Sequence, residues 1–421
     1  MLSIFTGLTF SAYAKENEGK CGEEVNSFFD AETETLTISG NGNMYNYTME
    51  TSPFYADKEI KHLVVETGVK SVGAFAFCDC TALSDIKLPF GLQSIGNSAF
   101  DGCTSLLSAA IPDSVSTLGS GAFINCKKLS SVNVPKGVSV ISDWAFSGCK
   151  SLRGVVIPDN VKIISQWAFY GCTALRSLSL GRGVNTIEKA AFSYCSALNW
   201  INIPAGVNTI SDYAFAGTTS LLGFSVNGAN ASYSSARGVL FNKQKSQLLQ
   251  YPAGNRSASY TVPASVRKIG TGSFWNCLYL NNVIIHEKVS YIDKNALEGS
   301  SAKINAYPFS FAFHFAKVNE IPYSPIKLKT PKIKRIKRGR RRITVKWKTD
   351  STLSGYQLQY STKKNMKRAK RITVKNASKG KRVIKRLHST RKYYVRIRAY
   401  KTVNGKRLYS KWSKKKRIKV K

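Results

Sequence analysis

Histidine is scarce in this 421-residue chain, and its four copies are scattered. None of them lies in a recognisable spacing with a cysteine and a carboxylate, the grouping that nucleophilic catalysis needs. The four are His62, His286, His314 and His388. Phosphate-binding glycine loops, dinucleotide fingerprints, zinc-ligand pairs and calcium loops are also missing. We therefore expect no enzyme activity, no cofactor and no metal site.

Acidic residues are almost absent from the last part of the chain. Residues 326–421 hold 38 lysines and arginines but one acidic residue, Asp350, whereas residues 1–325 hold 25 basic and 23 acidic residues. Residues 326–421 therefore carry a net charge of +37 (38 − 1) and residues 1–325 carry +2 (25 − 23), out of +39 for the whole chain. Such asymmetry predicts that the C-terminal part meets an anionic partner.

Long hydrophobic runs are missing as well, so we expect no transmembrane segment. Residues 2–10 are apolar and precede Ala12-Tyr13-Ala14, which fits the small-x-small cleavage pattern of a secretion signal, although no Lys or Arg comes before them. We interpret residues 1–14 as a truncated signal peptide, which predicts a secreted or cell-surface protein. The alternative is that Met1 is the true start and the protein stays inside the cell, which would strengthen a nucleic-acid-binding reading.

The chain does contain a sequence repeat with a period of 23 residues. Phenylalanine marks each repeat, a cysteine follows it by three residues in six of the seven, and a leucine follows three further on. The phenylalanines are Phe77, Phe100, Phe123, Phe146, Phe169, Phe192 and Phe215, and the cysteines are Cys80, Cys103, Cys126, Cys149, Cys172 and Cys195. A fixed period of this length predicts a solenoid, in which each coil buries its apolar face against its neighbours.

One coil illustrates the plan. Leu83, Ile86 and Leu88 alternate as in a short strand, and Pro89 ends that strand because it cannot donate to a sheet ladder. Stacked coils would pair such strands in parallel. The cysteines would then form a column of buried, reduced thiols, because parallel side chains do not converge on a disulfide. Cys21 and Cys78 lie off this column, and a disulfide between them is left open.

The repeat L-x-x-I-x-I-P-x-x-V-x-x-I-x-x-x-A-F-x-x-C resembles the BspA type of leucine-rich repeat, found on bacterial surface proteins, over about 250 residues. We expect a mainly β fold with a capping segment at residues 15–65 and a leucine-rich repeat solenoid of 23-residue coils at 66–321. An enlarged coil at 227–261 contains a predicted hairpin. A strand and a short apolar helix would close the solenoid, and a proline-containing linker would follow at 322–330.

Residues 331–421 show short alternating strands, which predict a small β-sandwich. Trp347, Leu387 and Tyr393 make this segment resemble a basic fibronectin type III-like domain, with Tyr393 as its corner tyrosine. The run Tyr409-Ser410-Lys411-Trp412-Ser413 is similar to the Trp-Ser-x-Trp-Ser box of some fibronectin-like domains. This similarity implies that Trp412 stacks on Arg396 and Arg398.

Two sets of residues are candidate binding sites. On the solenoid, the aromatic side chains that the repeat places outward, with one neighbouring amide, would bind a protein or a glycan: Trp200, Asn202, Trp144, Trp167 and Tyr213. The competing interpretation is that these rings only shield the edges of the coils. In the basic domain, a polyanion would bind Arg396, Arg398, Lys414, Lys415 and Lys416, although the two arginines can equally serve only to stack on Trp412.

These features together predict an exported bacterial surface or secreted recognition protein. The solenoid would bind a protein or glycan partner, and the basic domain would bind an anionic cell-wall or host polymer. The resemblance implies a role in adhesion. The alternatives are a structural spacer without a dedicated ligand and, less favoured, nucleic-acid binding through the basic domain.

Overall fold

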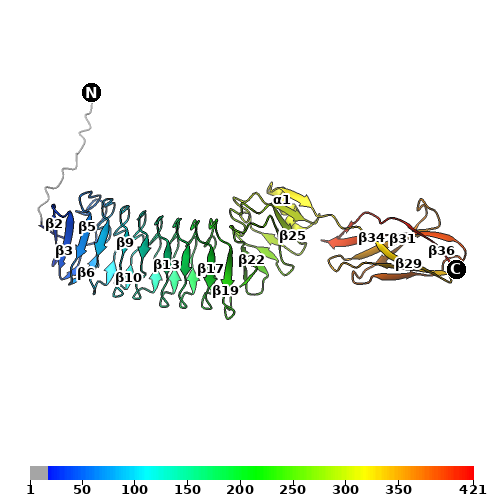
Figure 1. Ribbon diagram of the computed structural model, residues 1–421, viewed down its shortest axis with the longest axis horizontal. Coiled ribbons are helices and arrows are strands. Elements are labelled where there is room, and N and C mark those ends of the chain that lie inside the picture. Colours follow the sequence, from blue (N-terminus) through cyan, green and yellow to red (C-terminus); the bar gives the residue numbers. More distant parts are fainter. Residues whose placement is uncertain (1–17) are drawn as a thin grey trace, which may run out of the picture. The chain divides into compact units, whose positions relative to one another are not determined.

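The computed structural model describes residues 18–421, and nearly all of its secondary structure is β-strand (Figure 1). The predicted signal peptide at residues 1–14 lies outside the described residues. The described chain forms two compact units: residues 18–258, 268–280 and 293–301 make the first, and residues 259–267, 281–292 and 302–421 make the second. Throughout these residues, no helix has the length and apolar character needed to cross a membrane.

The first unit consists mainly of two ladders of short parallel strands, each divided into two or more separately hydrogen-bonded sheets. One ladder is formed by β3 (Thr35–Gly40), β5 (His62–Val65), β7 (Asp85–Lys87), β9 (Ser108–Ala109), β11 (Ser131–Val132), β13 (Gly154–Val156), β15 (Ser177–Ser179), β17 (Trp200–Ile203) and β19 (Gly223–Val226). The other is formed by β4 (Gly42–Asn43), β6 (Val69–Val72), β8 (Ser94–Ile95), β10 (Thr117–Leu118), β12 (Val140–Ile141), β14 (Ile163–Ile164), β16 (Thr186–Ile187) and β18 (Thr209–Ile210).

The register of these ladders repeats the period of the sequence. Ser131 pairs with Ser108, Leu178 with Val155, and Ile187 with Ile164, so each residue lies beside its equivalent in the next coil. This arrangement confirms the predicted solenoid. Each apolar column is therefore continuous from coil to coil, and no single coil has a complete core of its own.

The phenylalanine column forms the centre of this core. Successive rings from Phe54 to Phe215 stack with centroids 5.1–5.7 Å apart and planes within 24° of each other. Phe54, which lies 23 residues before Phe77, belongs to this column although the sequence analysis assigned it to the capping segment. The first coil therefore begins before residue 66.

The cysteine column is buried, and all nine cysteines of the chain are free. Each Sγ from Cys80 to Cys195 donates to the carbonyl oxygen of the phenylalanine 26 residues earlier, at 3.0–3.2 Å. The thiols thus act as donors between coils as well as small apolar groups. A disulfide between Cys21 and Cys78, left open by the sequence, does not form.

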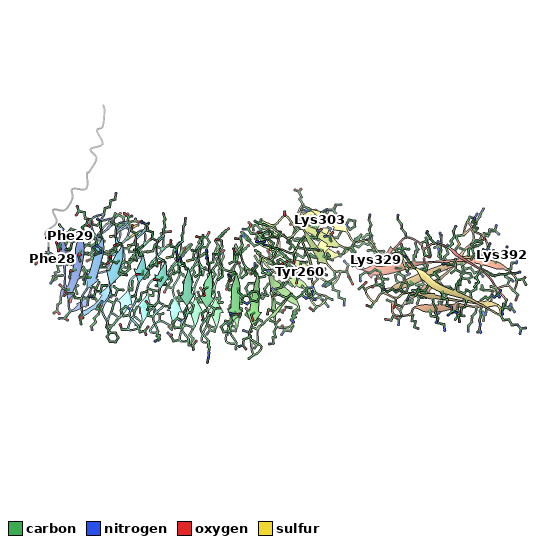
Figure 2. All side chains as sticks on the ribbon, in the orientation of Figure 1. Phe28, Phe29, Tyr260, Lys303, Lys329 and Lys392 are labelled. Carbon is green, nitrogen blue, oxygen red and sulfur yellow. The ribbon has the colours of Figure 1, made fainter. Side chains whose placement is uncertain are left out.

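An antiparallel cap opens the first unit. β1 (Glu18–Lys20) and β2 (Val25–Asp30) pair antiparallel, and β2 also pairs antiparallel with β3. On β2, Phe28 is 44% exposed and the adjacent Phe29 only 7%, as a strand with one buried face requires (Figure 2). The cap thus joins the core through alternate residues of β2.

The enlarged coil contains the predicted hairpin of β21 (Val239–Asn242) and β22 (Gln247–Gln250). A further strand, β20 (Tyr233–Ala236), pairs antiparallel with β21. On the other side, β22 pairs in parallel with β24 (Lys268–Ile269) of the next coil. Tyr251 lies 23 residues before Phe274 and packs against it in a tilted arrangement, with centroids 5.6 Å apart and planes 34° apart. The insertion therefore ends where Tyr251 restores the aromatic column.

The second unit includes the last parallel strands of the solenoid. β23 (Ser259–Thr261), β25 (Asn282–Ile285), β27 (Lys303–Ala306) and β28 (Tyr323–Pro325) follow one another in register, and β26 (Tyr291–Ile292) is a further short strand. The predicted helix is α1 (Phe311–Val318), which Ser310 caps by accepting from the N–H of Phe313. Residues 323–325, which the sequence placed in the linker, instead pair with β27.

The rest of this unit, where Lys329 and Lys392 are labelled in Figure 2, contains two antiparallel sheets. One consists of β29 (Ile333–Gly339), β30 (Arg342–Trp347) and β33 (Lys381–Ile384). The other consists of β32 (Lys370–Val374), β31 (Gly355–Ser361), β34 (Lys392–Val403) and β35 (Lys406–Tyr409), with β36 (Lys416–Lys419) beside β34. Buried residues of both sheets form one core.

The stacked core can be tested in a single coil. Leu152 is fully buried, so Leu152→Asp places an unpaired charge among apolar columns and should cost roughly 3 kcal/mol or more of unfolding free energy. Val156→Asp is the matched control, because Val156 lies in the same coil and is 68% exposed. Urea denaturation of the full chain measures both. Equal effects of the two substitutions would show that the observed register is wrong.

Candidate functional site

The predicted aromatic stripe on the solenoid occupies a specific backbone position. The residue two places before each repeat phenylalanine has a positive φ, including Trp144 (60°), Trp167 (55°) and Tyr213 (62°). Glycine adopts this conformation without strain, as Gly121 does in the same column, whereas other residues incur a cost of about 1 kcal/mol. The large rings at these positions are therefore not the choice that the turn itself favours.

Four of the outward rings form one surface cluster, which we call the aromatic patch. Trp144 and Trp167 occupy equivalent positions of consecutive repeats and stack with centroids 4.5 Å apart and planes 18° apart. Tyr170 meets Trp144 edge-on at 6.3 Å, and Tyr194 meets Tyr170 at 5.4 Å. The sequence analysis missed both tyrosines. Their positions in the repeat could have indicated them, because Tyr170 directly follows Phe169 and Tyr194 lies two residues after Phe192.

The patch carries one nearby cation. Lys189 Nζ lies 5.9 Å from the centre of the Trp167 ring, a distance at which the quadrupole of the ring attracts the charge. The inner faces of Trp144 and Trp167 are occupied by each other. A ligand would therefore contact their edges and outer faces together with Tyr170 and Tyr194, and it would not insert between the two indoles.

Tyr213 does not join this patch. Its ring meets Trp275 edge-on at 5.3 Å, and its hydroxyl accepts from Nδ2 of Asn295 at 3.0 Å. Gly272, the next residue of the column after the enlarged coil, lies close to the Tyr213 ring. These contacts tie coils on both sides of the insertion together and give Tyr213 a structural role.

Trp200 and Asn202 lie outward on β17, as predicted, and Trp200 is 45% exposed. A Cβ on Gly223 of the adjacent strand would meet the Trp200 indole at 2.8 Å, so this ring covers a position without a side chain. Gly223 is buried beneath this ring. Trp200 thus has a packing role in addition to its exposed surface.

A pair of carboxylates occurs at another edge of the coils. The backbone N–H of Asp79 donates to the carbonyl oxygen of Asp101, and the Tyr55 hydroxyl donates to the Asp79 carboxylate at 3.4 Å. Burial, and secondarily the charge of Asp79, raise the pKa of Asp101 to about 6. Sequence reasoning found no such pair because it considered only the outward strand positions.

The histidines and thiols form no catalytic grouping. His62 Nδ1 lies 2.6 Å from a carboxylate oxygen of Asp85, and both side chains are exposed on the first ladder. Burial raises the pKa of the Cys103 and Cys126 thiols far above the ordinary value, so these two are poor nucleophiles. Over residues 18–421, no three His, Cys, Asp or Glu side chains are placed to hold a metal ion.

In the basic part, Arg396 and Arg398 stack on aromatic rings as the box resemblance implied. The guanidinium carbon of Arg396 lies 4.7 Å from the centre of the Trp412 ring, and that of Arg398 lies 4.5 Å from Trp412 and 3.7 Å from Tyr409. Their Nε atoms also donate to Gln359 and Gln357. These contacts satisfy the side-chain oxygens of the two glutamines, which are both buried.

The serines of the same run hold it against β34. Ser410 Oγ accepts from the N–H of Ala399 at 2.9 Å, and Ser413 Oγ accepts from the N–H of Ile397 at 3.0 Å. Both hydroxyls thus substitute for strand partners between β35 and β36. Lys414 and Lys415 follow as exposed residues, and Lys416 begins β36 and is exposed as well. The Nζ of Lys415 donates to the carbonyl oxygen of Lys364 at 2.9 Å.

The Asp101 carboxylate should make stability pH-dependent. Since its pKa in the folded state, about 6, exceeds the unfolded value of about 4, folding favours the protonated form. The resulting destabilisation is absent below about pH 4 and grows as pH rises through 6. Asp101→Asn should therefore stabilise the chain at pH 7.5 by about 1 kcal/mol, after allowance for solvent screening, and have no effect near pH 4. A pH-independent difference in urea midpoints would contradict this account.

The arginine–tryptophan stack should contribute measurably to folding. Trp412→Ala removes the ring between two guanidinium groups, and we expect a loss of about 1–3 kcal/mol in unfolding free energy. Trp412→Phe should recover part of this loss because a smaller ring remains. Lys411→Ala, at the exposed neighbouring position, is the control. Calorimetry in which both Trp412 variants melt like the unmodified chain would exclude the stack as a stabilising contact.

Comparison with known proteins agrees with the coil geometry. The family model described as BspA type leucine rich repeat region (6 copies) matches residues 47–173, 118–243 and 253–320. No curated protein matches the chain at a significant level.

Solved structures with a similar fold come from several bacteria. A leucine rich cell surface protein from Faecalibacterium prausnitzii A2-165 shares 22% identity over 69% of this chain and 76% of its own, with a TM-score of 0.48. The Pneumococcal vaccine antigen PcpA shares 21% identity over 70% of this chain and 67% of its own, with a TM-score of 0.40. Because the family model covers more than half of the sequence, the chain belongs to the BspA-type leucine-rich repeat family.

Proposed function

We propose that this chain is an exported surface recognition protein with two binding parts. The solenoid would present the aromatic patch to a protein or glycan, and residues 331–421 would form a fibronectin type III-like domain that binds an anionic envelope or host polymer. The family to which the chain belongs is typical of bacterial surfaces, which supports export. The residues that would carry a signal peptide lie outside the described part.

Several contacts support the fibronectin-like assignment. The Tyr393 hydroxyl, near the start of β34, accepts from the N–H of His388 at 3.1 Å, which is the bond that a corner tyrosine makes to the backbone a few residues upstream. Trp347 packs edge-on against Tyr356 inside the shared core, with centroids 5.4 Å apart. The pairing of three strands in one sheet and five in the other also fits such a domain.

The observation that carries the proposal is the unbalanced charge of residues 326–421. This segment contains 38 basic residues but one acidic residue, Asp350. The Asp350 side chain accepts hydrogen bonds from the hydroxyl and the N–H of Thr352. Such a domain releases the counterions of a polyanion on binding. Arg396 and Arg398 keep their charge while they stack. Lys414, Lys415 and Lys416 supply three adjacent exposed cations as further contacts.

The solenoid would recognise a different kind of ligand. Its charge is nearly balanced, so long-range attraction of a polyanion is weak there. The aromatic patch instead offers ring edges and faces that suit a sugar ring or an apolar anchor of a partner protein. Trp200 and Asn202 on β17 would offer a separate contact surface, whereas Tyr213 makes its contacts within the solenoid.

Binding to polyanions should be steeply dependent on salt. We expect the full chain to bind heparin-like glycan, polyol phosphate and DNA at low salt, with log K falling by about 0.7–0.9 per log unit of salt for each phosphate contacted. Neutralising Lys414, Lys415 and Lys416 to Gln should weaken binding. Neutralising Lys127, Lys128 and Lys150, three exposed lysines of the solenoid, should not. Titrations at several salt concentrations test this, and equal losses in both triple variants would reject the basic domain as the binding part.

A further inference from the structure

The outward face of the sheet β29-β30-β33 concentrates cations in register. Ile343, Val345 and Trp347 of β30 point into the core, so the intervening residues Arg342, Thr344 and Lys346 point outward. Their partners on β29 and β33 share that face. We call the five exposed cations of this surface the β30 face: Arg335, Lys337, Arg342, Lys346 and Lys381.

The pairing places like charges directly opposite one another. Lys346 pairs with Arg335 on one side and with Lys381 on the other, which makes a straight row of three cations across three strands. Neighbouring strands are about 4.8 Å apart, and like charges directly opposite destabilise a sheet. Folding alone therefore gives no reason for this row.

Among residues 18–421, no recorded ion pair offsets the charge of the row. Asp350 is the single acidic residue between 326 and 421, and its side chain is engaged with Thr352. The ion pairs that the structure records among residues 18–421 include none of the five cations. Arg342 extends across Gly339, the residue opposite, and so fills the space that a side chain there would occupy.

The β30 face differs in this respect from the Arg396 and Arg398 stack. Those two guanidinium groups donate to glutamines and are covered by Trp412, whereas the cations of the β30 face have exposed side chains. We propose that the β30 face is the main binding surface for a linear phosphodiester polymer, and that it contacts the charged backbone of that polymer. This inference rests on the proposed polyanion-binding function and assigns it a surface and a ligand chemistry.

The neutral residues of the face argue for backbone recognition. Between the charged positions lie Thr344 and Val383, which are paired with each other. The face thus lacks an aromatic ring on which a sugar or a base could stack. Its two arginines offer planar forks that match phosphate oxygens, and its lysines add point charges. A polymer that carries its charges in the backbone, such as a polyol phosphate or duplex DNA, fits this surface best.

The test compares two triple variants of the full chain. Arg335→Gln, Lys346→Gln and Lys381→Gln remove the row. Lys363→Gln, Lys367→Gln and Arg368→Gln remove the same charges from the exposed loop between β31 and β32. The probes are synthetic poly(glycerol phosphate), a short DNA duplex and heparin. We expect the row variant to lose at least about tenfold in affinity for the two phosphodiesters and about two to three units of salt slope, and the loop variant to lose less than about threefold.

A melting experiment separates loss of binding from loss of fold. Since the row is a set of opposed like charges, its removal should leave the melting temperature unchanged or raise it. Poly(glycerol phosphate) should raise the melting temperature of the unmodified chain more than that of the row variant, because a ligand stabilises the state that binds it.

The outcomes distinguish this inference from the proposed function. Equal losses in both variants, or none in either while the unmodified chain binds, would overturn the β30 face and leave polyanion binding in place. Failure of the unmodified chain to bind any probe would overturn both. If the unmodified chain binds heparin more tightly than both phosphodiesters, and the row variant keeps that heparin binding, the assignment of a phosphodiester ligand is overturned. A preference of more than about tenfold for either the polyol phosphate or DNA would support a phosphodiester ligand and would show which of the two polymers the face binds.

Discussion

The structure of the solenoid depends on one constraint, the in-register stacking of coils 23 residues apart. Each position meets its own kind in the next coil, so phenylalanine stacks on phenylalanine and each column thiol donates to a phenylalanine carbonyl. Substituting one member therefore affects the two coils beside it. Where the register is interrupted by the enlarged coil, Tyr251 restores the column, and Trp200 covers the gap at Gly223. The surface that could bind ligands consists of positions that this stacking leaves free.

The aromatic patch shows how such positions are used. The turn before each repeat phenylalanine holds a residue at positive φ, and glycine satisfies that requirement at Gly121. Trp144 and Trp167 occupy the same turn position, stack on each other and gather Tyr170 and Tyr194 beside them. Because the turn itself does not demand these rings, their presence supports recognition of an uncharged or apolar group.

The second unit is subject to a different constraint, because it contains few acidic residues with which its many cations could pair. The core of its two antiparallel sheets is apolar, so most of its cations lie at exposed positions. Some of them are stabilised internally: Arg396 and Arg398 donate to buried glutamines and stack on Trp412, and the buried Lys401 pairs with Glu287. The row of Arg335, Lys346 and Lys381 has no such stabilisation, and an external anion is the partner that would provide it.

The sequence alone determined the solenoid, the burial of the column residues and the charge asymmetry, because period, alternation and composition are local properties of the chain. It also predicted the short helix that is α1, and short alternating strands within residues 331–421. Strands rich in lysine and arginine, such as β32 and β33, escaped detection because charged edge residues hide the alternation. The place of Tyr213 beside Asn295 and the opposition of Lys346 to Arg335 depend on which strands and coils become neighbours. Pairing between distant segments is set by packing of the whole fold, and no local pattern encodes it.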